Sequence, residues 1–298
     1  MDEIYGMIMW RVTAERAVSP LAFMRRRLVR VVPLYWSVTS LMVGVLLVAP
    51  SLLRSARFDL AHIIASYLFV AWQRPPPYAG PYPLLVPGWT LNYEMFFYAL
   101  FSTALTFPAR ARGVFILGAL TVFVVAGQFC PHLPLILRVY SAPIVLEFGF
   151  GIAIAMLARR LHAPRTGLGL LGTGCALLAL LAVGESTGMD RLIRLGIPAA
   201  LIVAGAALWE AGRTVPLCQF AMLMGNASYS IYLVHTPWLA ALATVWLMAG
   251  VAVNNPIPLV VVGVGTSITL GIMVHFLIER PMIGALTGRH VPSVPTER

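Results

Sequence analysis

The fold is decided by the run Thr214–Ile278, TVPLCQFAMLMGNASYSIYLVHTPWLAALATVWLMAGVAVNNPIPLVVVGVGTSITLGIMVHFLI, which contains no Asp, Glu, Lys or Arg. One helix that crosses a bilayer needs about 20 apolar residues, so this run is long enough for two. Asn254, Asn255 and Pro256 provide a turn signal between them. We therefore expect two consecutive membrane-spanning helices here.

The composition of the whole chain points to the same solvent. Of the 298 residues, 59% are hydrophobic and only 11% are charged, whereas roughly 25% are charged in an ordinary soluble domain. These values exclude a disordered chain and argue against a soluble enzyme. The net charge of +10 comes from 21 basic residues, all of them arginine. In a membrane protein such an excess reports orientation, so we predict no nucleic-acid partner.

Further apolar runs bring the predicted number of spans to eight. They cover residues 34–50, 89–107, 113–129, 139–158, 167–183 and 195–209. Leu60–Gln73 is shorter and is typical of an interfacial or re-entrant helix. If it does not cross, 15 arginines lie on the side of the N-terminus and six on the other side; if it crosses, the split is ten against eleven. The positive-inside rule therefore favours eight spans and a cytoplasmic C-terminus.

The predicted fold class is all-α: a polytopic membrane helix bundle of about eight transmembrane helices, with a partial N-terminal helix around Ile4–Trp10 and one interfacial helix. We expect one membrane domain over residues 1–285 and a cytoplasmic tail over residues 286–298. Pro75–Pro87 is expected to be an outer loop. Arginine without lysine is typical of GC-rich coding, which predicts a bacterial protein of the cytoplasmic (inner) membrane.

The densest charge cluster contains Arg25, Arg26, Arg27 and Arg30. On a helix, Arg30 shares one face with Arg26 and Arg27. Guanidinium groups bind phosphates through paired hydrogen bonds, so this face suits a pyrophosphate. Spacing alone favours a simpler interpretation, in which the arginines anchor a helix at the membrane surface.

A second candidate is Glu94, which lies within the apolar run 89–107. A carboxylate at membrane depth usually faces a partner or a water-filled cavity. Tyr98 lies one turn further on and is placed to donate a hydrogen bond to it. Because Glu94 is expected only about 8 Å from the outer end of its helix, the alternative is an interfacial carboxylate that reaches water.

A third candidate is His235, which closes a polar stripe with Ser228 and Tyr232, and with Tyr229 beside them. Asn226 or Ser228 is expected to cap the start of this helix, which places His235 about 13 Å from the cytoplasmic end. A membrane histidine acts as a base, a proton relay or a polar contact between helices.

Other ionisable residues carry weaker signals. Glu147 lies within a predicted span and is a plausible ligand for an arginine or a polar head group. Glu279 and Arg280 are expected to anchor a helix end after His275. The remaining histidines are expected in loops or at interfaces, without a function: His62, His132, His162 and His290. No zinc spacing, phosphate-binding glycine loop or serine-nucleophile motif is present, so we predict no metal site.

These clusters together resemble membrane acyltransferase family 3, whose members transfer acyl groups from coenzyme A to sugars of surface or secreted glycans. The stretch from Phe23 to Trp36 resembles the family's arginine motif. The stretch from Trp89 to Tyr98 is similar to its tryptophan–glutamate–tyrosine motif, and that from Asn226 to His235 to its serine–tyrosine–histidine helix. Glu279-Arg280-Pro281 resembles the closing motif, and Phe148-Gly149-Phe150-Gly151 is a weaker match.

The resemblance also implies where the chain departs from the family. The family begins with a helix that carries an arginine and the histidine usually assigned as essential. By comparison, this chain begins within the second helix, where Tyr5-Gly6-Met7 stands at a serine–glycine–phenylalanine motif. We therefore expect either a start codon further upstream or a truncated gene product.

The resemblance implies acyl transfer from acyl-CoA to a glycan hydroxyl. Our hypothesis for this chain makes His235 and Glu94 the catalytic residues. It places acyl-CoA, expected to be acetyl-CoA, on the donor-binding residues Arg26, Arg27, Arg30, Tyr229 and Tyr232. Tyr35, Trp89, Tyr98, Glu147, Ser228 and Glu279 are expected to support them. We expect no permanently bound cofactor, a glycan or lipid-linked sugar as acceptor, and about 10 Å between Glu94 and His235 along the membrane normal.

Two other classes stay open at this point. A proton-coupled transporter or flippase would use Glu94, Glu147 and His235 as a proton relay, although no convincing inverted repeat is present. A truncated, inactive homologue would insert into the membrane without turnover.

Overall fold

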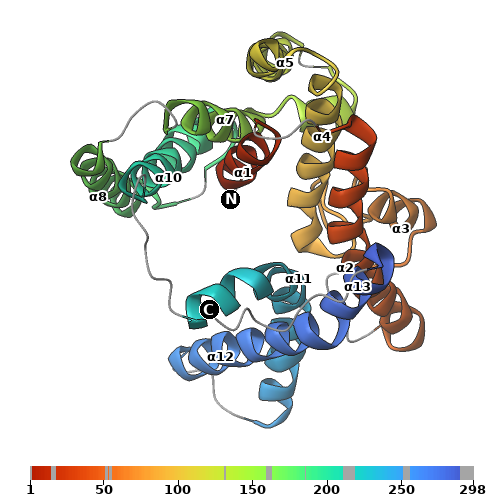
Figure 1. The fold of residues 1–298 in the computed structure, drawn as a ribbon. Coiled ribbons are helices and arrows are strands. Elements are labelled where there is room, and N and C mark those ends of the chain that lie inside the picture. The colour runs from red at the N-terminus through yellow and green to blue at the C-terminus, as the bar shows by residue number, and fades with distance from the viewer. Residues whose placement is uncertain are drawn as a thin grey trace. The chain divides into compact units, whose positions relative to one another are not determined.

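The computed structural model describes residues 2–14, 18–50, 53, 56–130, 132–158, 163–184, 186–210, 219–250 and 256–288. Every regular element in these ranges is a helix, and the described part of the chain contains no strand (Figure 1). The prediction of an all-α polytopic membrane protein is confirmed.

The helices follow one another along the chain as α1 (Asp2–Ala14), α2 (Pro20–Val48), α3 (Leu60–Tyr67), α4 (Trp89–Ala104), α5 (Ala109–Phe129), α6 (Leu135–Tyr140), α7 (Leu146–Ala158), α8 (Pro164–Leu181), α9 (Gly188–Arg191), α10 (Ile197–Glu210), α11 (Gln219–Met248), α12 (Ile257–Val274) and α13 (Arg280–Thr287). Two 3₁₀ turns, η2 (Val86–Gly88) and η3 (Pro143–Val145), precede α4 and α7. Two π-helical turns, η4 (Leu192–Gly196) and η5 (His275–Glu279), continue α9 into α10 and α12 into α13.

Among the described residues, six continuous helical stretches are long and apolar enough to cross a bilayer: Pro20–Val48, Ala109–Phe129, Pro164–Leu181, Gly188–Glu210, Gln219–Met248 and Ile257–Thr287. They correspond to six of the eight predicted spans. The other two predicted spans are shorter helices, because α4 has 16 residues and η3 with α7 covers only Pro143–Ala158. The pair of helices predicted from the long uncharged run is present as α11 and α12.

The chain forms two compact units. The first contains Met1–Met24 and Tyr93–Pro216, and the second contains Arg25–Asn92 and Leu217–Arg298. Each unit therefore combines an early segment of the sequence with a later one.

Glycines set the helix packing in the first unit. Gly6 of α1 faces the backbone carbonyl of Phe148 in α7, and Gly151 of α7 faces the carbonyl of Glu3 in α1. A side chain at either glycine would meet backbone atoms of the other helix, so the two helices approach as closely as glycine permits. Gly205 of α10 packs against the backbone of α8 in the same way, and Figure 1 shows α1, α7, α8 and α10 grouped together.

In the second unit, α11 and α12 lie side by side and antiparallel (Figure 1). The indole N–H of Trp238 donates to Thr266 Oγ1 at 2.8 Å, and about two turns earlier on α11 the side chain of Ile231 fills the space over Gly271. Polar pairs and close glycine contacts of this kind hold helices together where lipid supplies little hydrophobic driving force.

The short helix α3 runs back along α2. Its first turn places Ile63 against Leu46 near the C-terminal end of α2. At its last residue, the carbonyl of Tyr67 accepts a hydrogen bond from the indole of Trp36, ten residues earlier on α2 than Leu46. The helix ends at Tyr67, six residues before the predicted end at Gln73. Because α3 runs antiparallel to the second half of α2, it fits the re-entrant interpretation better than the interfacial one.

The predicted topology can be tested with the native cysteines. Cys130 is exposed immediately after α5, where we expect the outer surface, and Cys175 is exposed in the middle of α8. A chain that keeps only Cys130, through Cys175→Ala and Cys218→Ala, should react with a membrane-impermeant maleimide in intact cells. A chain that keeps only Cys175 should not react, because the bilayer shields it. Labelling of Cys130 only after permeabilisation would reverse the orientation.

Candidate functional site

The arginine cluster lies inside the first turns of α2, not ahead of the helix. Ser19 Oγ accepts a backbone N–H three residues on, and Pro20 follows as the first helical residue, a combination typical of helix starts. The side chains of Arg26 and Arg30 are exposed, and that of Arg27 is half-buried. Because they lie on one continuous helix, Arg26 and Arg30 share a face as the spacing predicts.

Two tyrosines hold α11 against the segments that carry the other motifs. The hydroxyl of Tyr229 donates to the carbonyl of Val31 in α2 at 2.7 Å. The hydroxyl of Tyr232 donates to the carbonyl of Pro87 at 2.7 Å and lies 2.9 Å from Thr90 Oγ1. The hydroxyl proton of each tyrosine is thus donated to a backbone carbonyl. Any contact of these two residues with an acyl donor would therefore use their aromatic rings.

The imidazole of His235 is oriented by its own helix. Its Nδ1 lies 2.6 Å from the carbonyl oxygen of Tyr232, and a carbonyl only accepts, so Nδ1 carries a proton. In the neutral ring, Nε2 is then the basic nitrogen. It lies 3.0 Å from the hydroxyl of Thr236, which donates to it. These contacts define which nitrogen of the half-buried ring is basic, and the predicted role of His235 stays a prediction.

The start of α4 lies beside the middle of α2. The ring of Tyr35 is fully buried and fills the space over Gly88, the residue before Trp89. The hydroxyl of Tyr35 donates to the carbonyl of Ser66 at the end of α3. Tyr35 is about 20 Å from the C-terminal end of α2, so α4 begins well inside the unit and Trp89 is half-buried there.

Glu94 is a buried carboxylate with an internal donor. Its side chain is 2% exposed, and the hydroxyl of Tyr98 donates to its Oε2 at 2.9 Å. The predicted Glu94–Tyr98 pair is therefore confirmed. A carboxylate that reaches water would be exposed, so burial disfavours the interfacial alternative and agrees with an internal partner.

Glu147 has the arginine partner that the sequence suggested. Its Oε1 lies 2.6 Å from a guanidinium nitrogen of Arg191, the last residue of α9. The carboxylate is buried and Arg191 is half-buried, so the pair links the start of α7 to α9 within the first unit. Breaking such a pair leaves an uncompensated charge, which is strongly destabilising.

Glu279 corrects an expectation. It does not anchor a helix end, because the helix continues to Thr287 and the side chain is 4% exposed. Its Oε2 accepts from the hydroxyl of Ser230 at 2.6 Å and lies 2.8 Å from His275 Nδ1. The π-helical turn between His275 and Glu279 directs this carboxylate at α11, and π turns are frequent at functional sites.

The predicted helix caps are also wrong. Asn226 and Ser228 lie inside α11, which already includes Gln219, and the hydroxyl of Ser228 donates back to the carbonyl of Gly225. His235 therefore lies about 24 Å along α11 from Gln219, whereas the sequence predicted about 13 Å between His235 and the start of the helix. Residues 211–218 lie outside the described part of the chain.

The structure divides the predicted site residues between the two units. The second unit brings together the arginine cluster, Tyr35, Trp89, Tyr229, Tyr232, His235 and Glu279, whereas the first holds Glu94, Tyr98 and Glu147. The separation of Glu94 from His235 stays a prediction.

Three polar residues of the structure were not among the predicted site residues: Ser230, His275 and His62. Ser230 and His275 bind Glu279, and the four-residue spacing of His275 and Glu279 was the available signal. His62 was expected in a loop or at an interface; it lies in α3, within the predicted interfacial or re-entrant segment, and the finding that the sequence did not signal is that its side chain is buried. The histidine His132 is exposed as expected, and His162 and His290 lie outside the described residues.

Six helical stretches long and apolar enough to cross a bilayer, found in the described part of the chain together with several buried carboxylates, define a multi-pass helical membrane protein. The chain belongs to the acyltransferase family whose acyltransferase domain matches residues 4–276. It is similar to the exopolysaccharide production protein ExoZ of Rhizobium meliloti (strain 1021), with 33% identity over 290 residues, which are 97% of this chain and 89% of that relative. No solved structure matches it. The family membership confirms the resemblance seen in the three motifs.

Proposed function

We propose that this membrane acyltransferase transfers an acyl group from acyl-CoA to a hydroxyl of an exported or cell-surface glycan. The acyl group that we propose is acetyl. The relative's name connects that protein with exopolysaccharide production, and we assign the same class of acceptor to this chain. The acceptor is a polysaccharide or its lipid-linked precursor, reached from within the bilayer.

The proposed reaction is an acyl exchange between a thioester and an alcohol. The glycan oxygen attacks the thioester carbonyl, the carbon–sulfur bond breaks, and the products are an ester and coenzyme A thiol. Nε2 of His235 takes the hydroxyl proton and returns it to the leaving sulfur. Glu94 serves the acceptor side.

One observation carries this proposal: the exposed arginines of α2 and the histidine of α11 belong to the same compact unit. The exposed Arg30 is adjacent to Val31, whose carbonyl holds Tyr229 of α11. His235 lies about 9 Å further along α11 than Tyr229. Coenzyme A phosphates on Arg26 and Arg30 would place the extended pantetheine arm along this stretch of α11, with its thioester toward His235.

The proposed function is tested by measuring acetyl transfer from acetyl-CoA to polysaccharide with the full chain in lipid nanodiscs. Incubation with acetyl-CoA labelled in the acetyl group and with the polysaccharide of the producing cell should give labelled ester that mild alkali releases. Deletion of the gene should remove the same ester from that polysaccharide. Proton-coupled solute flux without acyl-CoA would instead establish a transporter, and insertion without turnover under any acyl donor would establish an inactive homologue.

The donor assignment predicts a loss of acyl-CoA affinity. Arg26→Gln with Arg30→Gln removes two exposed guanidinium groups, and we expect at least tenfold weaker binding of acetyl-CoA in calorimetry because both phosphate contacts are lost. The matched control is Arg110→Gln with Arg165→Gln, which removes two exposed arginines from the first turns of α5 and α8 and should leave affinity unchanged. Equal affinity of both double variants would remove the donor site from α2.

A further inference from the structure

One turn of α11, residues 229–232, is held from four sides within the second unit. Successive side chains on a helix are rotated by about 100°, so four consecutive residues point in four directions. Here each of the four contacts a different segment. The segments are α2, η5, α12 and η2, reached through the pairs Tyr229–Val31, Ser230–Glu279, Ile231–Gly271 and Tyr232–Pro87. Together these contacts define one rotational setting of α11 about its own axis.

The direction of His235 depends on this setting. Its Nδ1 donates to the carbonyl of Tyr232, the last residue of the held turn, at 2.6 Å. On the helix, His235 projects between the directions of Ile231 and Tyr232, one turn further along. A rotation of α11 at residues 229–232 would therefore carry the imidazole with it and change where Nε2 points.

The contact of Ser230 is the one of the four that involves a charged side chain. Ser230 is 0% exposed and Glu279 is 4% exposed. Oε2 of Glu279 accepts from the Ser230 hydroxyl at 2.6 Å and lies 2.8 Å from Nδ1 of His275. An ionised carboxylate only accepts hydrogen bonds, so the serine and the histidine both donate to it.

This contact also has the largest cost of displacement. Hydrogen bonds to a carboxylate are roughly twice as strong as those between neutral groups, and a buried carboxylate that loses a donor is left undersolvated. The tyrosine contacts are weaker determinants, because Val31 lies inside a helix whose carbonyls already accept within that helix. We therefore expect Ser230 and Glu279 to contribute most to the preference of α11 for one rotational setting.

We infer that Glu279 is a positioning residue for His235. Held by His275, its carboxylate fixes the rotational setting of α11 through Ser230 and so directs Nε2 of His235. A buried polar contact of this kind selects one register among alternatives, as a single buried polar residue does in coiled coils. The π-helical turn that ends at Glu279 packs against α11 and supplies the contact. The consequence for catalysis rests on the proposed function, in which His235 is the base.

The kinetic test uses the full chain in lipid nanodiscs with acetyl-CoA and the polysaccharide of the producing cell. Glu279→Gln keeps the size of the side chain and removes its charge. We expect kcat to fall by up to roughly 10²-fold, the cost of misplacing a reacting group by about 1 Å, with KM for acetyl-CoA unchanged. The matched control is Glu210→Gln, which neutralises an exposed carboxylate at the end of α10 and should leave both constants unchanged. In a His235→Gln background, Glu279→Gln should cause no further loss, because it acts through the base that is already missing.

A spectroscopic measurement tests the position of His235 without any substrate. The histidines of the full chain are isotope-labelled, and the imidazole NMR signal that His235→Gln removes is assigned to His235. We expect Glu279→Gln and Ser230→Ala each to shift or broaden this signal, because α11 is no longer held in one setting, and Glu210→Gln to leave it in place. Ser230→Ala keeps the contact of Glu279 with His275, so it keeps the test valid if Glu279→Gln does not fold.

Three results would overturn the inference. The first is an unchanged His235 signal in both variants, and the second is an unchanged kcat in Glu279→Gln. The third is a loss of rate that is as large in the His235→Gln background as in the wild type, because Glu279 would then act independently of His235. A displaced His235 signal in a chain whose wild type transfers no acyl group would support the positioning role and refute the proposed function.

Discussion

Replacing His235 with glutamine is expected to lower the rate of acyl transfer by roughly 10²–10⁴-fold, the usual contribution of a general base. Glutamine keeps a polar side chain of similar size but has no basic nitrogen to take the hydroxyl proton. Since Nδ1 is fixed by the carbonyl of Tyr232 and Nε2 faces Thr236, the loss should appear in kcat with little change in acyl-CoA affinity. The measurement is release of coenzyme A thiol by the full chain in nanodiscs.

A matched histidine controls for the substitution itself. His132→Gln makes the same chemical change at an exposed position outside the candidate site, and its rate should equal that of the wild type. Thermal unfolding of both variants then distinguishes a role of His235 as the base from a role in helix packing. If His235→Gln loses folded protein to the same degree as activity, His235 holds helices together and is not the base.

Substituting alanine for Gly151 is expected to destabilise the folded protein by about 1–3 kcal/mol, the usual cost of overpacking. In a helix this change normally stabilises by roughly 0.5–1 kcal/mol, so the expected sign is reversed. The reason is that the added Cβ would meet the backbone carbonyl of Glu3, and backbone atoms of α1 cannot move aside as a flexible side chain can. The measurement is Tm in detergent. Gly6→Ala should behave likewise, because its Cβ meets the carbonyl of Phe148.

The control is Gly118→Ala in α5, where a Cβ meets nothing within 4 Å. This variant should be as stable as the wild type or slightly more stable. A Gly151→Ala protein with an unchanged or raised Tm would show that α1 and α7 do not approach as closely as the structure indicates.

Local chemistry made part of the site predictable. The pair of Glu94 and Tyr98 follows from helical spacing alone, because residues four apart on a helix are neighbours whatever surrounds them. An arginine was one of the two partners predicted for Glu147, beside a polar head group, since a carboxylate within a span needs a compensating group. Which arginine supplies it required the fold, because Arg191 is 44 residues away.

Errors arose where a boundary or a long-range contact decides the outcome. Asn226 and Ser228 suggested a helix start, but an apolar membrane helix continues through polar residues whose hydroxyls bond back to the preceding turn, as Ser228 does. Glu279 suggested a helix end because it opens a charged, proline-containing motif. The tertiary contact with Ser230 buries it instead.

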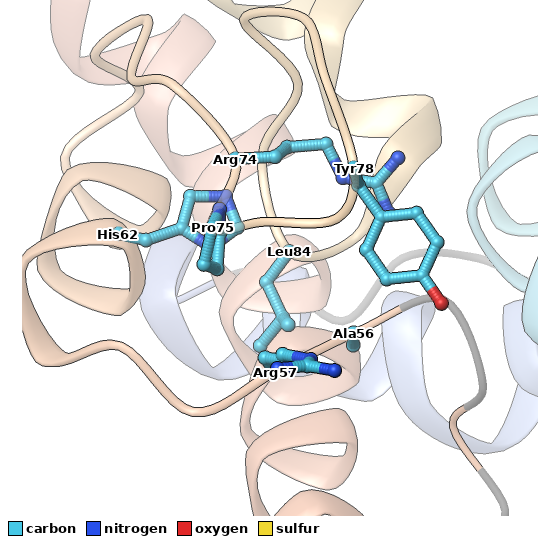
Figure 2. Close-up of a pocket in the computed structure, with 7 residues that line it drawn as sticks. All are labelled: Ala56, Arg57, His62, Arg74, Pro75, Tyr78 and Leu84. Carbon is cyan, nitrogen blue, oxygen red and sulfur yellow. The ribbon is translucent and has the colours of Figure 1, made fainter.

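The sequence by itself determined the solvent, the helical class and the family, because hydropathy and ordered short motifs are properties of the chain that no partner segment alters. Only the tertiary structure decided that α3 returns along α2, that Tyr229 and Tyr232 bind backbone carbonyls of other segments, and that the buried His62 lies beside Arg74 and Leu84 in the wall of a small hollow (Figure 2). These features depend on groups far apart in sequence that must satisfy each other's hydrogen bonds once water is excluded, and spacing along one helix carries no information about them.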